Sequence, residues 1–226
     1  MGDSLRLLPY GARAILMALP DAATRRTLTR WLGAQDLEGI DVVPAESTIL
    51  LDLSDPSITD TDAHARLTRV AQGLRDLDLE SLTAQPPSEV TPVTIEVRYD
   101  GPDLAATADS FGMSTEALVD WHTASPWIVE FLGFMPGFGY LTRADHQRPV
   151  PRLDSPRRAI PGGAVGLAGL YCGIYPRSSP GGWQLLGHTD HVLFDATGDG
   201  ATLSPGGRVQ FQEIRQPPHG ATHDQP

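Results

Sequence analysis

The chain has 226 residues, 40% of them apolar, which is enough for one large or two ordinary domains with a sizeable core. Its net charge is −11 and its 17 basic residues are all arginines, so we expect neither general nucleic-acid binding nor chemistry that needs a lysine. The single cysteine, Cys172, excludes an intramolecular disulfide, and the lack of a long apolar run or a signal-peptide pattern predicts a cytoplasmic protein without a membrane segment.

Residues 1–85 alternate strand and helix signals and are predicted to form a small α+β domain. Short apolar segments predict four strands, at residues 5–8, 13–19, 40–43 and 48–53. Asp21 is a suitable N-cap for a helix between the second and third strands. A second amphipathic helix follows the fourth strand, capped by Thr59 or Thr61.

The three prolines of residues 86–92 predict a linker, because proline cannot join a strand ladder. Residues 93–215 are predicted to form a second, mainly-β domain, and the polar residues 216–226 a disordered tail. His219 and His223 lie in that tail, four positions apart, but without helix formers around them. We therefore expect no metal site.

The second domain begins with an alternating strand over residues 93–99, followed by two short helices that start near Pro102 and at Ser114. After Pro126 only strands and turns are expected, with strands at residues 127–132, 165–170, 183–186, 191–194 and 208–214. Many short strands separated by Gly and Pro turns favour a β-barrel or sandwich.

Glycine clusters alternate with large aromatic side chains between residues 133 and 187. Tyr140, Tyr175 and Trp183 belong to these segments, and Gln184 follows directly. Glycine lets the backbone approach a ligand closely, and rings beside it suit a concave site or an interface. The alternative for each cluster is a tight barrel turn with no further role.

Residues 143–158 carry five arginines against two aspartates, in a protein that is otherwise acidic. Their prolines predict a rigid, irregular loop. Arg157 and Arg158, which precede the Pro161-Gly162-Gly163 turn, are candidates for binding a carboxylate or phosphate. The alternatives are a solvated loop or pairing with acids of the first domain.

His122, His188 and His191 are the candidates for acid–base chemistry. His122 ends a short helix, where the helix dipole is expected to raise its pKa; the alternative is a half-buried helix-end histidine. His188 fits a turn, and Cys172 fits a buried, inert thiol in a strand. No serine-hydrolase, zinc-protease or dinucleotide motif is present.

Five stretches together resemble one known family. They are Tyr99–Leu104 (YDGPDL), Phe131–Leu141 (FLGFMPGFGYL), Ser155–Arg158 (SPRR), Pro161–Gly169 (PGGAVGLAG) and Gly173–Gly187 (GIYPRSSPGGWQLLG). Their order and spacing, over about residues 4–215, are similar to the bacterial KipI family, also called allophanate hydrolase subunit 1 or the B subunit of 5-oxoprolinase.

This resemblance implies an α+β N-terminal domain followed by a cyclophilin-like β-barrel. It implies a homologous larger partner (allophanate hydrolase subunit 2, or the C subunit of 5-oxoprolinase), the pair resembling the carboxyltransferase domain of urea carboxylase. With a third, LamB/YcsF-type component, the A subunit of 5-oxoprolinase, the complex would open 5-oxo-L-proline to L-glutamate using ATP. The absence of lysine and of a phosphate-binding motif predicts that ATP is bound mainly by other subunits. Because the site is expected to be completed by the partner, we expect this chain to be inactive alone.

Our leading hypothesis places the substrate in a cleft completed by the partner. Arg157 and Arg158 would bind carboxylate or phosphate oxygens, and His122 would assist proton transfer. Four side chains would shape the pocket: Tyr140, Tyr175, Trp183 and Gln184.

Two alternatives belong to other functional classes. Named members of the family inhibit a histidine kinase, in which case the aromatic loops would form a docking surface. The chain could also serve an allophanate- or urea-processing hydrolase, or a carboxyltransferase with a biotinylated partner. Peptidyl-prolyl isomerase activity is discounted, because a shared fold does not carry function.

Overall fold

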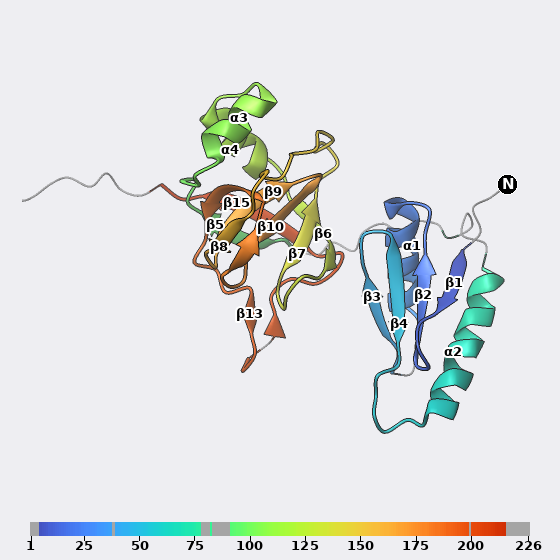
Figure 1. Ribbon diagram of the computed structural model, residues 1–226. Coiled ribbons are helices and arrows are strands. Elements are labelled where there is room, and N and C mark those ends of the chain that lie inside the picture. The colour runs from blue at the N-terminus through green and yellow to red at the C-terminus, as the bar shows by residue number, and fades with distance from the viewer. Residues whose placement is uncertain (1–4, 38, 78–81, 83–90, 199, 216–226) are drawn as a thin grey trace, which may run out of the picture.

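The computed structural model describes residues 5–37, 39–77, 82, 91–198 and 200–215. Most of the linker predicted at residues 86–92, and all of the tail predicted at 216–226, lie outside the described residues, so the division of the chain at this linker stays a prediction. Figure 1 shows a barrel with two short helices at one end, beside a four-stranded sheet with two helices. No described helix is long and apolar enough to cross a membrane.

The first half has the element order ββαββα that its sequence pattern predicts. Its strands are β1 (Arg6–Pro9), β2 (Ala14–Ala18), β3 (Asp41–Pro44) and β4 (Thr48–Asp52), and its helices are α1 (Ala22–Gly33) and α2 (Asp60–Arg75). The strands pair antiparallel in the order β1-β2-β4-β3. The short turn between β3 and β4 is the part of this sheet that matters for the site described below.

Both helices of the first half begin at a capping residue named from the sequence. Asp21 accepts a hydrogen bond from the backbone N–H of Thr24 at 2.7 Å, and the Thr59 hydroxyl accepts one from that of Asp62 at 3.2 Å. Each bond satisfies a donor that the first helical turn leaves unpaired. The apolar stripes of the two helices and the sheet share one core, which includes Met17, Leu28, Leu32, Ile49, Leu51, Leu67 and Leu74.

The second half is built mainly from strands. Its main sheet contains β5 (Val93–Val97), β6 (Trp127–Leu132), β7 (Gly139–Thr142), β9 (Ala164–Ala168), β10 (Tyr171–Ile174), β12 (Gln184–His188) and β15 (Arg208–Glu213), in the order β12-β9-β10-β7-β6-β15-β5. Two small ribbons pair β8 (Arg157–Ile160) with β11 (Ser179–Gly181) and β13 (Phe194–Asp195) with β14 (Gly200–Ala201). Two helices, α3 (Leu104–Phe111) and α4 (Thr115–Thr123), complete this half.

A backbone bridge between Arg98 and His188 joins the two ends of the seven-strand order. The two residues exchange N–H···O bonds of 2.8 and 2.9 Å, so the sheet closes nearly into a barrel. The chains come so close here that a Cβ on Gly187 would lie 2.1 Å from the carbonyl oxygen of Arg98. Only glycine fits at this point of the closure.

The barrel strands have apolar side chains on both faces. Val165 and Leu167 of β9, with Cys172 and Ile174 of β10, point into the main core of the barrel. A separate cluster covers the opposite face and consists of Met135, Phe138, Tyr140, Ile160, Ala164, Ala168, Tyr171, Tyr175, Trp183 and Leu185. We call this second group the outer aromatic cluster. Three of its members, Tyr140, Ala168 and Tyr171, line the candidate site described below.

The structure corrects several strand boundaries. The strand predicted at residues 191–194 is wrong, because residues 191–193 are irregular and β13 begins only at Phe194. The strand expected around Cys172 is present as β10, whereas β7, β8 and β11 were not predicted. In β7 and β11 glycine and proline obscure the alternation that a half-buried strand normally shows. The irregular, proline-rich loop is confirmed for residues 143–156, whereas Arg157 and Arg158 begin β8.

Candidate functional site

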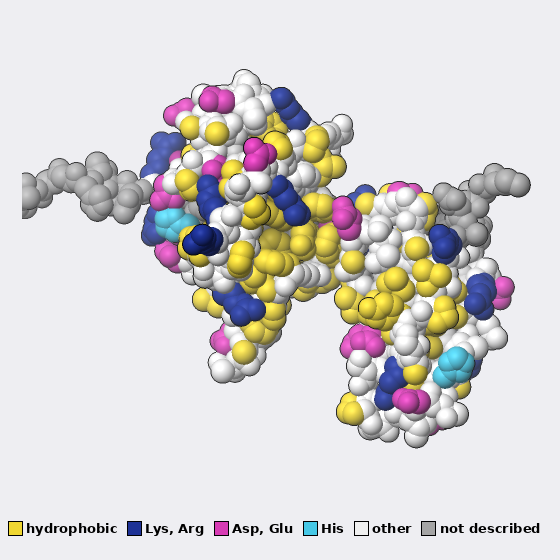
Figure 2. All heavy atoms as spheres, in the orientation of Figure 1, with side chains coloured by type: hydrophobic (Ala, Val, Ile, Leu, Met, Phe, Trp, Pro, Cys, Tyr) yellow, Lys and Arg dark blue, Asp and Glu magenta, His cyan; other side chains and the backbone are white. Residues whose placement is uncertain are grey.

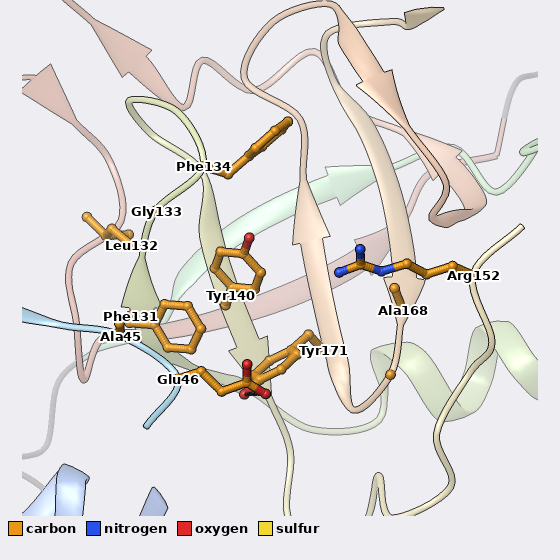
Figure 3. A pocket seen from close by; sticks show the side chains of 11 residues that line it. Ala45, Glu46, Phe131, Leu132, Gly133, Phe134, Tyr140, Arg152, Ala168 and Tyr171 are labelled. Atoms are coloured by element: carbon orange, nitrogen blue, oxygen red, sulfur yellow. Dashed lines mark hydrogen bonds between the residues drawn. The ribbon is translucent and has the colours of Figure 1, made fainter. Parts of the chain in front are cut away.

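A pocket of about 470 Å³ opens where the barrel meets the β3–β4 turn of the first half. Its lining consists of Ala45, Glu46, Phe131, Leu132, Gly133, Phe134, Tyr140, Arg152, Ala168, Gly169 and Tyr171. Figure 3 shows Phe131 and Tyr140 side by side on one wall, Glu46 against Tyr171, and Arg152 pointing toward the rings from the other side. We call this cavity the junction pocket; its size falls in the range of small-molecule sites.

The aromatic wall of the junction pocket is a stack backed by buried rings. Phe131 stacks on Tyr140 with ring centroids 4.4 Å apart, and Tyr171 meets both rings edge-on at 5.7 and 5.5 Å. Phe138 and Trp183 pack behind Tyr140 at 5.1 and 5.9 Å. These contacts fix the orientation of the wall, because each ring is held by at least one other.

Gly173 of β10 makes room for the buried layer of this wall. A Cβ at Gly173 would lie 2.7 Å from Cζ of Phe138 and 2.8 Å from Cζ3 of Trp183. The rings therefore rest directly on the strand backbone. This use of glycine, to let large rings approach a strand, is one reason for the glycine and aromatic alternation in the sequence.

The acidic side of the junction pocket is formed by Glu46. Its carboxylate lies 3.5 Å from the hydroxyl of Tyr171. Burial, followed by the negative charges of Glu46 and Glu130, raises the pKa of Tyr171 to about 12. The phenol therefore stays protonated at neutral pH and can donate a hydrogen bond.

The cation of the junction pocket is Arg152, which belongs to the irregular loop of residues 143–156. The loop is fixed on both sides of Arg152, by a bond from the Gln184 side-chain amide to the Pro151 carbonyl (3.0 Å) and by one from the Leu153 N–H to the Gly182 carbonyl (2.8 Å). Within the described part of the chain the Arg152 guanidinium has no ion pair. Its charge opposes the upward shift that burial causes in the pKa of Tyr140.

A buried arginine beneath the junction pocket joins the two halves of the chain. Arg25 of α1 is 1% exposed and donates to the backbone carbonyls of Glu130 (3.1 Å) and Glu46 (3.2 Å), as well as to the Glu130 carboxylate. Its guanidinium lies 5.7 Å from the ring centroid of Phe131. One side chain thus positions the acidic turn and one ring of the aromatic wall.

The rim of the junction pocket includes a backbone outlier. Phe134 has φ = +66°, which is unusual for a residue with a Cβ, and its ring is 60% exposed. The loop is held from below, because Gly137 packs against the backbone of Leu193 and the Cβ of Phe194. An exposed ring kept in a strained conformation points to a contact with something outside this chain.

The structure brings only one of the predicted site residues, Tyr140, to the lining of the junction pocket. Tyr175 and Trp183, 2% and 6% exposed, lie in the buried layer behind it. Gln184 does not line the pocket either and instead holds the loop that carries Arg152. The ligand-binding roles predicted for these side chains remain untested.

The two arginines predicted to bind an anion do not line the junction pocket. Arg157 pairs with Asp103 at 2.8 Å, and the same carboxylate accepts the N–H of Leu185 at 2.7 Å. Arg157 therefore ties the start of α3 to the barrel. Arg158 is exposed on β8, outside the pocket lining.

His122 lies inside the barrel rather than at its surface. Its Nδ1 is 2.7 Å from the Tyr99 hydroxyl and its Nε2 is 3.3 Å from Sγ of Cys172. Burial, and then the positive charge of Arg143, lowers the pKa of His122 to about 3. The predicted rise in pKa is wrong because the helix end is desolvated. The ring has no exposed surface, so the catalytic role predicted for it has no structural support.

The prediction that Cys172 is buried in a strand is confirmed, and burial raises the pKa of its thiol. His188 hydrogen-bonds the Asp100 carboxylate at 2.8 Å, away from the junction pocket. Within the described residues, no three His, Cys, Asp or Glu side chains are grouped so as to hold a metal ion.

Sequence reasoning missed most of the residues that line the junction pocket. Phe134 and Tyr171 belong to the rings that alternate with the glycine clusters, although they were not chosen as site residues, and Phe131 lies just before the first cluster. Arg152 was one of five arginines in a loop, with nothing local to distinguish it. Glu46 has no sequence signal at all, since it reaches the pocket only through the packing of the two halves.

Comparison with known proteins identifies the family. The family described as "Carboxyltransferase domain, subdomain C and D" matches residues 5–204.

Three relatives are each named as the B subunit of 5-oxoprolinase. The one from Escherichia coli O157:H7 is 36% identical over 210 residues, 89% of this chain and 92% of that protein. The one from Haemophilus influenzae is 30% identical over 92% of this chain and 97% of that protein. The one from Bacillus subtilis is 43% identical over 55% of this chain and 53% of that protein. The chain belongs to this carboxyltransferase-domain family.

Solved structures agree with this assignment. TTHA0988 matches with a TM-score of 0.69 at 34% identity, over 91% of this chain but only 41% of the TTHA0988 chain. PH0987 from Pyrococcus horikoshii matches with a TM-score of 0.51 at 27% identity, over 92% of this chain and 97% of that one. Kluyveromyces lactis urea carboxylase shares the fold (TM-score 0.61, 17% identity), with this chain spanning 22% of it.

Proposed function

We propose that this chain is the B subunit of a 5-oxoprolinase and that the junction pocket binds 5-oxo-L-proline for ATP-dependent opening to L-glutamate. Relatives that bear this subunit name match nearly the whole chain. The observation that carries the proposal is the lining of the junction pocket, which sets a guanidinium without an ion pair among the described residues opposite a wall of rings. A small anionic lactam has the matching features, a carboxylate and a mostly apolar ring.

The side chains divide the recognition between them. Arg152 forks onto the substrate carboxylate, while Phe131 and Tyr140 pack against the ring methylenes. The Tyr171 hydroxyl stays protonated, with a pKa of about 12, and directs its single proton toward Glu46, so its oxygen accepts a hydrogen bond from the lactam N–H. ATP would supply the activation that an unstrained amide needs: its γ-phosphoryl group would pass to the amide oxygen with release of ADP. Addition of water to the carbonyl carbon, loss of phosphate and cleavage of the C–N bond would then give L-glutamate. The chain holds and orients the lactam for that step.

We further propose that the chain is inactive alone and works with the homologous larger subunit and with a LamB/YcsF-type subunit. The family description names subdomains C and D only, and in TTHA0988 the matching region is 41% of a longer chain. The relatives matched over 92% and 97% of their own length are named as a B subunit, and a subunit name supports work in a complex. We also propose that the barrel is cyclophilin-like. In the complex, ATP would be bound mainly by the partner subunits.

Figure 2 shows a face that suits such a partner. Hydrophobic side chains gather over the barrel around β7 and β10 and continue toward the four-stranded sheet. Three exposed apolar side chains of this half are Phe134, Val192 and Phe194; Phe134 contacts Phe138 of the outer aromatic cluster, and Phe194 begins β13 beside Gly137. Apolar surface of this kind usually marks an interaction site.

The test is co-expression with the two partner subunits, followed by an assay of glutamate formation from 5-oxoproline and ATP, with urea and allophanate assayed in parallel. Arg152→Gln should raise KM for 5-oxoproline about ten- to hundred-fold, the cost of losing a charged hydrogen bond. Arg177→Gln, an exposed arginine outside the pocket, is the matched control. Turnover of urea or allophanate alone, or an unchanged KM in Arg152→Gln, would refute the proposal.

A further inference from the structure

A second cavity, of about 310 Å³, lies between α1 and the barrel and shares no lining residue with the junction pocket. One side is a single face of α1, and the other is formed by β6 and the turn of residues 204–207 that leads into β15. We call it the α1–β15 cleft. The proposed oxoprolinase reaction makes no use of it.

Positive charge is concentrated in the α1–β15 cleft. Among the described residues that line it are four arginines (Arg25, Arg26, Arg30 and Arg208) and one acid, Glu130. The Glu130 carboxylate already accepts bonds from Arg25 and Arg26. In a chain with a net charge of −11, this local excess of cations attracts anions.

Two of these arginines have donors to offer a ligand. Arg208 is half-buried, and its side chain makes no hydrogen bond or ion pair with any described residue. Arg26 is 39% exposed and uses one nitrogen, Nη1, to reach Glu130 at 2.7 Å. A guanidinium carries five N–H donors, so Arg26 keeps several.

The backbone holds Arg208 in place. Arg208 is the first residue of β15 and pairs with Ile128 of β6. The preceding turn is fixed by bonds from the Gly206 N–H to the Val129 carbonyl (2.7 Å) and from the Gly207 N–H to the Ser204 carbonyl (2.9 Å). A cation on a fixed strand end loses less entropy on binding than one on a mobile loop.

Thr29 adds a polar group between these arginines. It lies on the same face of α1 as Arg25 and Arg26, and its buried hydroxyl finds no hydrogen-bond partner in the described structure. A buried hydroxyl without a partner is costly, and an anionic oxygen beside it would supply the missing acceptor.

We propose that the α1–β15 cleft binds a phosphate-type oxyanion, free or as the terminal group of a small molecule, between Arg26 and Arg208. Two guanidiniums match the charge and the several acceptor oxygens of a phosphate dianion. Because α1 and β15 belong to different halves of the chain, the bound anion also ties the halves together and stabilises the folded protein.

The experiment uses the full chain alone, without 5-oxoproline, so its outcome is independent of the proposed oxoprolinase activity. Titration calorimetry with inorganic phosphate, at an ionic strength held constant with chloride, should show one saturable site. Phosphate should raise the unfolding temperature, as binding to the folded state requires. Arg208→Gln should weaken binding at least ten-fold, Arg208→Lys should keep part of it, and Arg177→Gln should leave it unchanged.

Parallel titrations with ADP and ATP identify the source of the anion. Tighter nucleotide binding that is also lost in Arg208→Gln means that the phosphate is part of a larger ligand, whereas equal affinities mean that the phosphate group alone is recognised. Urea unfolding of each variant checks that the fold is retained. The proposal is overturned if the wild type binds none of these anions saturably, or if Arg208→Gln, still folded, binds them with unchanged affinity.

Discussion

Arg25 on α1 and Glu130 on β6, 105 positions apart, form an ion pair in which the side chains are only 1% and 2% exposed. Both residues line the α1–β15 cleft, and Arg25 contacts two residues that line the junction pocket. Arg25 also holds the Glu46 carbonyl and lies over Phe131, while Glu130 accepts a further bond of 2.7 Å from the Thr142 hydroxyl. The relative position of the two halves, and hence the shape of both cavities, depends on this contact.

Breaking the pair from one side should be strongly destabilising. Arg25→Met leaves the Glu130 carboxylate buried without its main partner, and we expect a loss of about 3–5 kcal/mol in the free energy of unfolding. The double variant Arg25→Met/Glu130→Gln removes the charge and should recover part of that loss. Urea unfolding measures both. The exposed Arg215–Glu213 pair is the control, and removing it should cost less than about 1 kcal/mol. An equally small effect at Arg25 would contradict this account.

Gly173→Ala should test the contact between β10 and the outer aromatic cluster. The added methyl group would overlap Phe138 and Trp183, and overpacking of this kind costs about 1–3 kcal/mol. Gly73→Ala is the opposite case, because Gly73 lies within α2 with nothing near its missing Cβ and should stabilise the helix by roughly 0.5–1 kcal/mol. Thermal or urea unfolding should give opposite signs for the two variants.

Phe134→Asn should separate assembly from stability. Asparagine tolerates the left-handed backbone conformation that costs phenylalanine about 1–2 kcal/mol, so the chain alone should be no less stable. Loss of the exposed ring should reduce co-purification with the larger subunit. Tyr10→Asn is matched in exposure (61% against 60%) but lies in the first half, and should leave co-purification unchanged. Equal co-purification of all three proteins would rule out Phe134 as a docking residue.

His122 should make the protein sensitive to mild acid. The folded-state pKa of about 3 lies below the ordinary value of 6.5, so the unfolded chain binds the proton first as the pH falls. The contribution is complete above pH 6.5 and is lost progressively between pH 6.5 and 3. At pH 5 this loss is about 2 kcal/mol, at about 1.4 kcal/mol for each pKa unit.

The check is urea unfolding at pH 7 and pH 5 for the wild type and for His122→Gln. Carboxylates contribute to acid destabilisation in both proteins, and His146, another buried histidine with a lowered pKa, remains in both. The difference between the two proteins therefore isolates His122. An identical loss of stability between pH 7 and pH 5 would show that His122 is not held neutral by burial.

The local structure of this protein could be predicted well from the sequence. The caps at Asp21, Thr59 and Ser114 are where the pattern of side chains places them, and each makes its hydrogen bond within three residues. Apolar spacing located both helices of the first half. Such features depend on neighbours a few residues away, so a single sequence contains the information needed to find them.

The candidate site could be predicted only in outline. Rings between glycines indicated the region, and Tyr140 does line the junction pocket. Among the arginines, Arg157 and Arg158 were preferred to Arg152, but Asp103, 54 positions from Arg157, forms an ion pair with Arg157. Likewise, the position of His122 at the end of a short helix suggested an accessible acid or base. Only the packing of α4 against β15 places its side chain in the core.

By itself the sequence determined the helix caps, the strand-rich second half, the buried thiol and the family. Only the tertiary structure decided that Glu46 and Arg152 line the same pocket and that Arg25 joins the halves. The physical reason is distance along the chain. Capping and alternation are short-range, whereas the ionic partner of an arginine is chosen by which surfaces are brought together when the barrel closes and the first half packs against it.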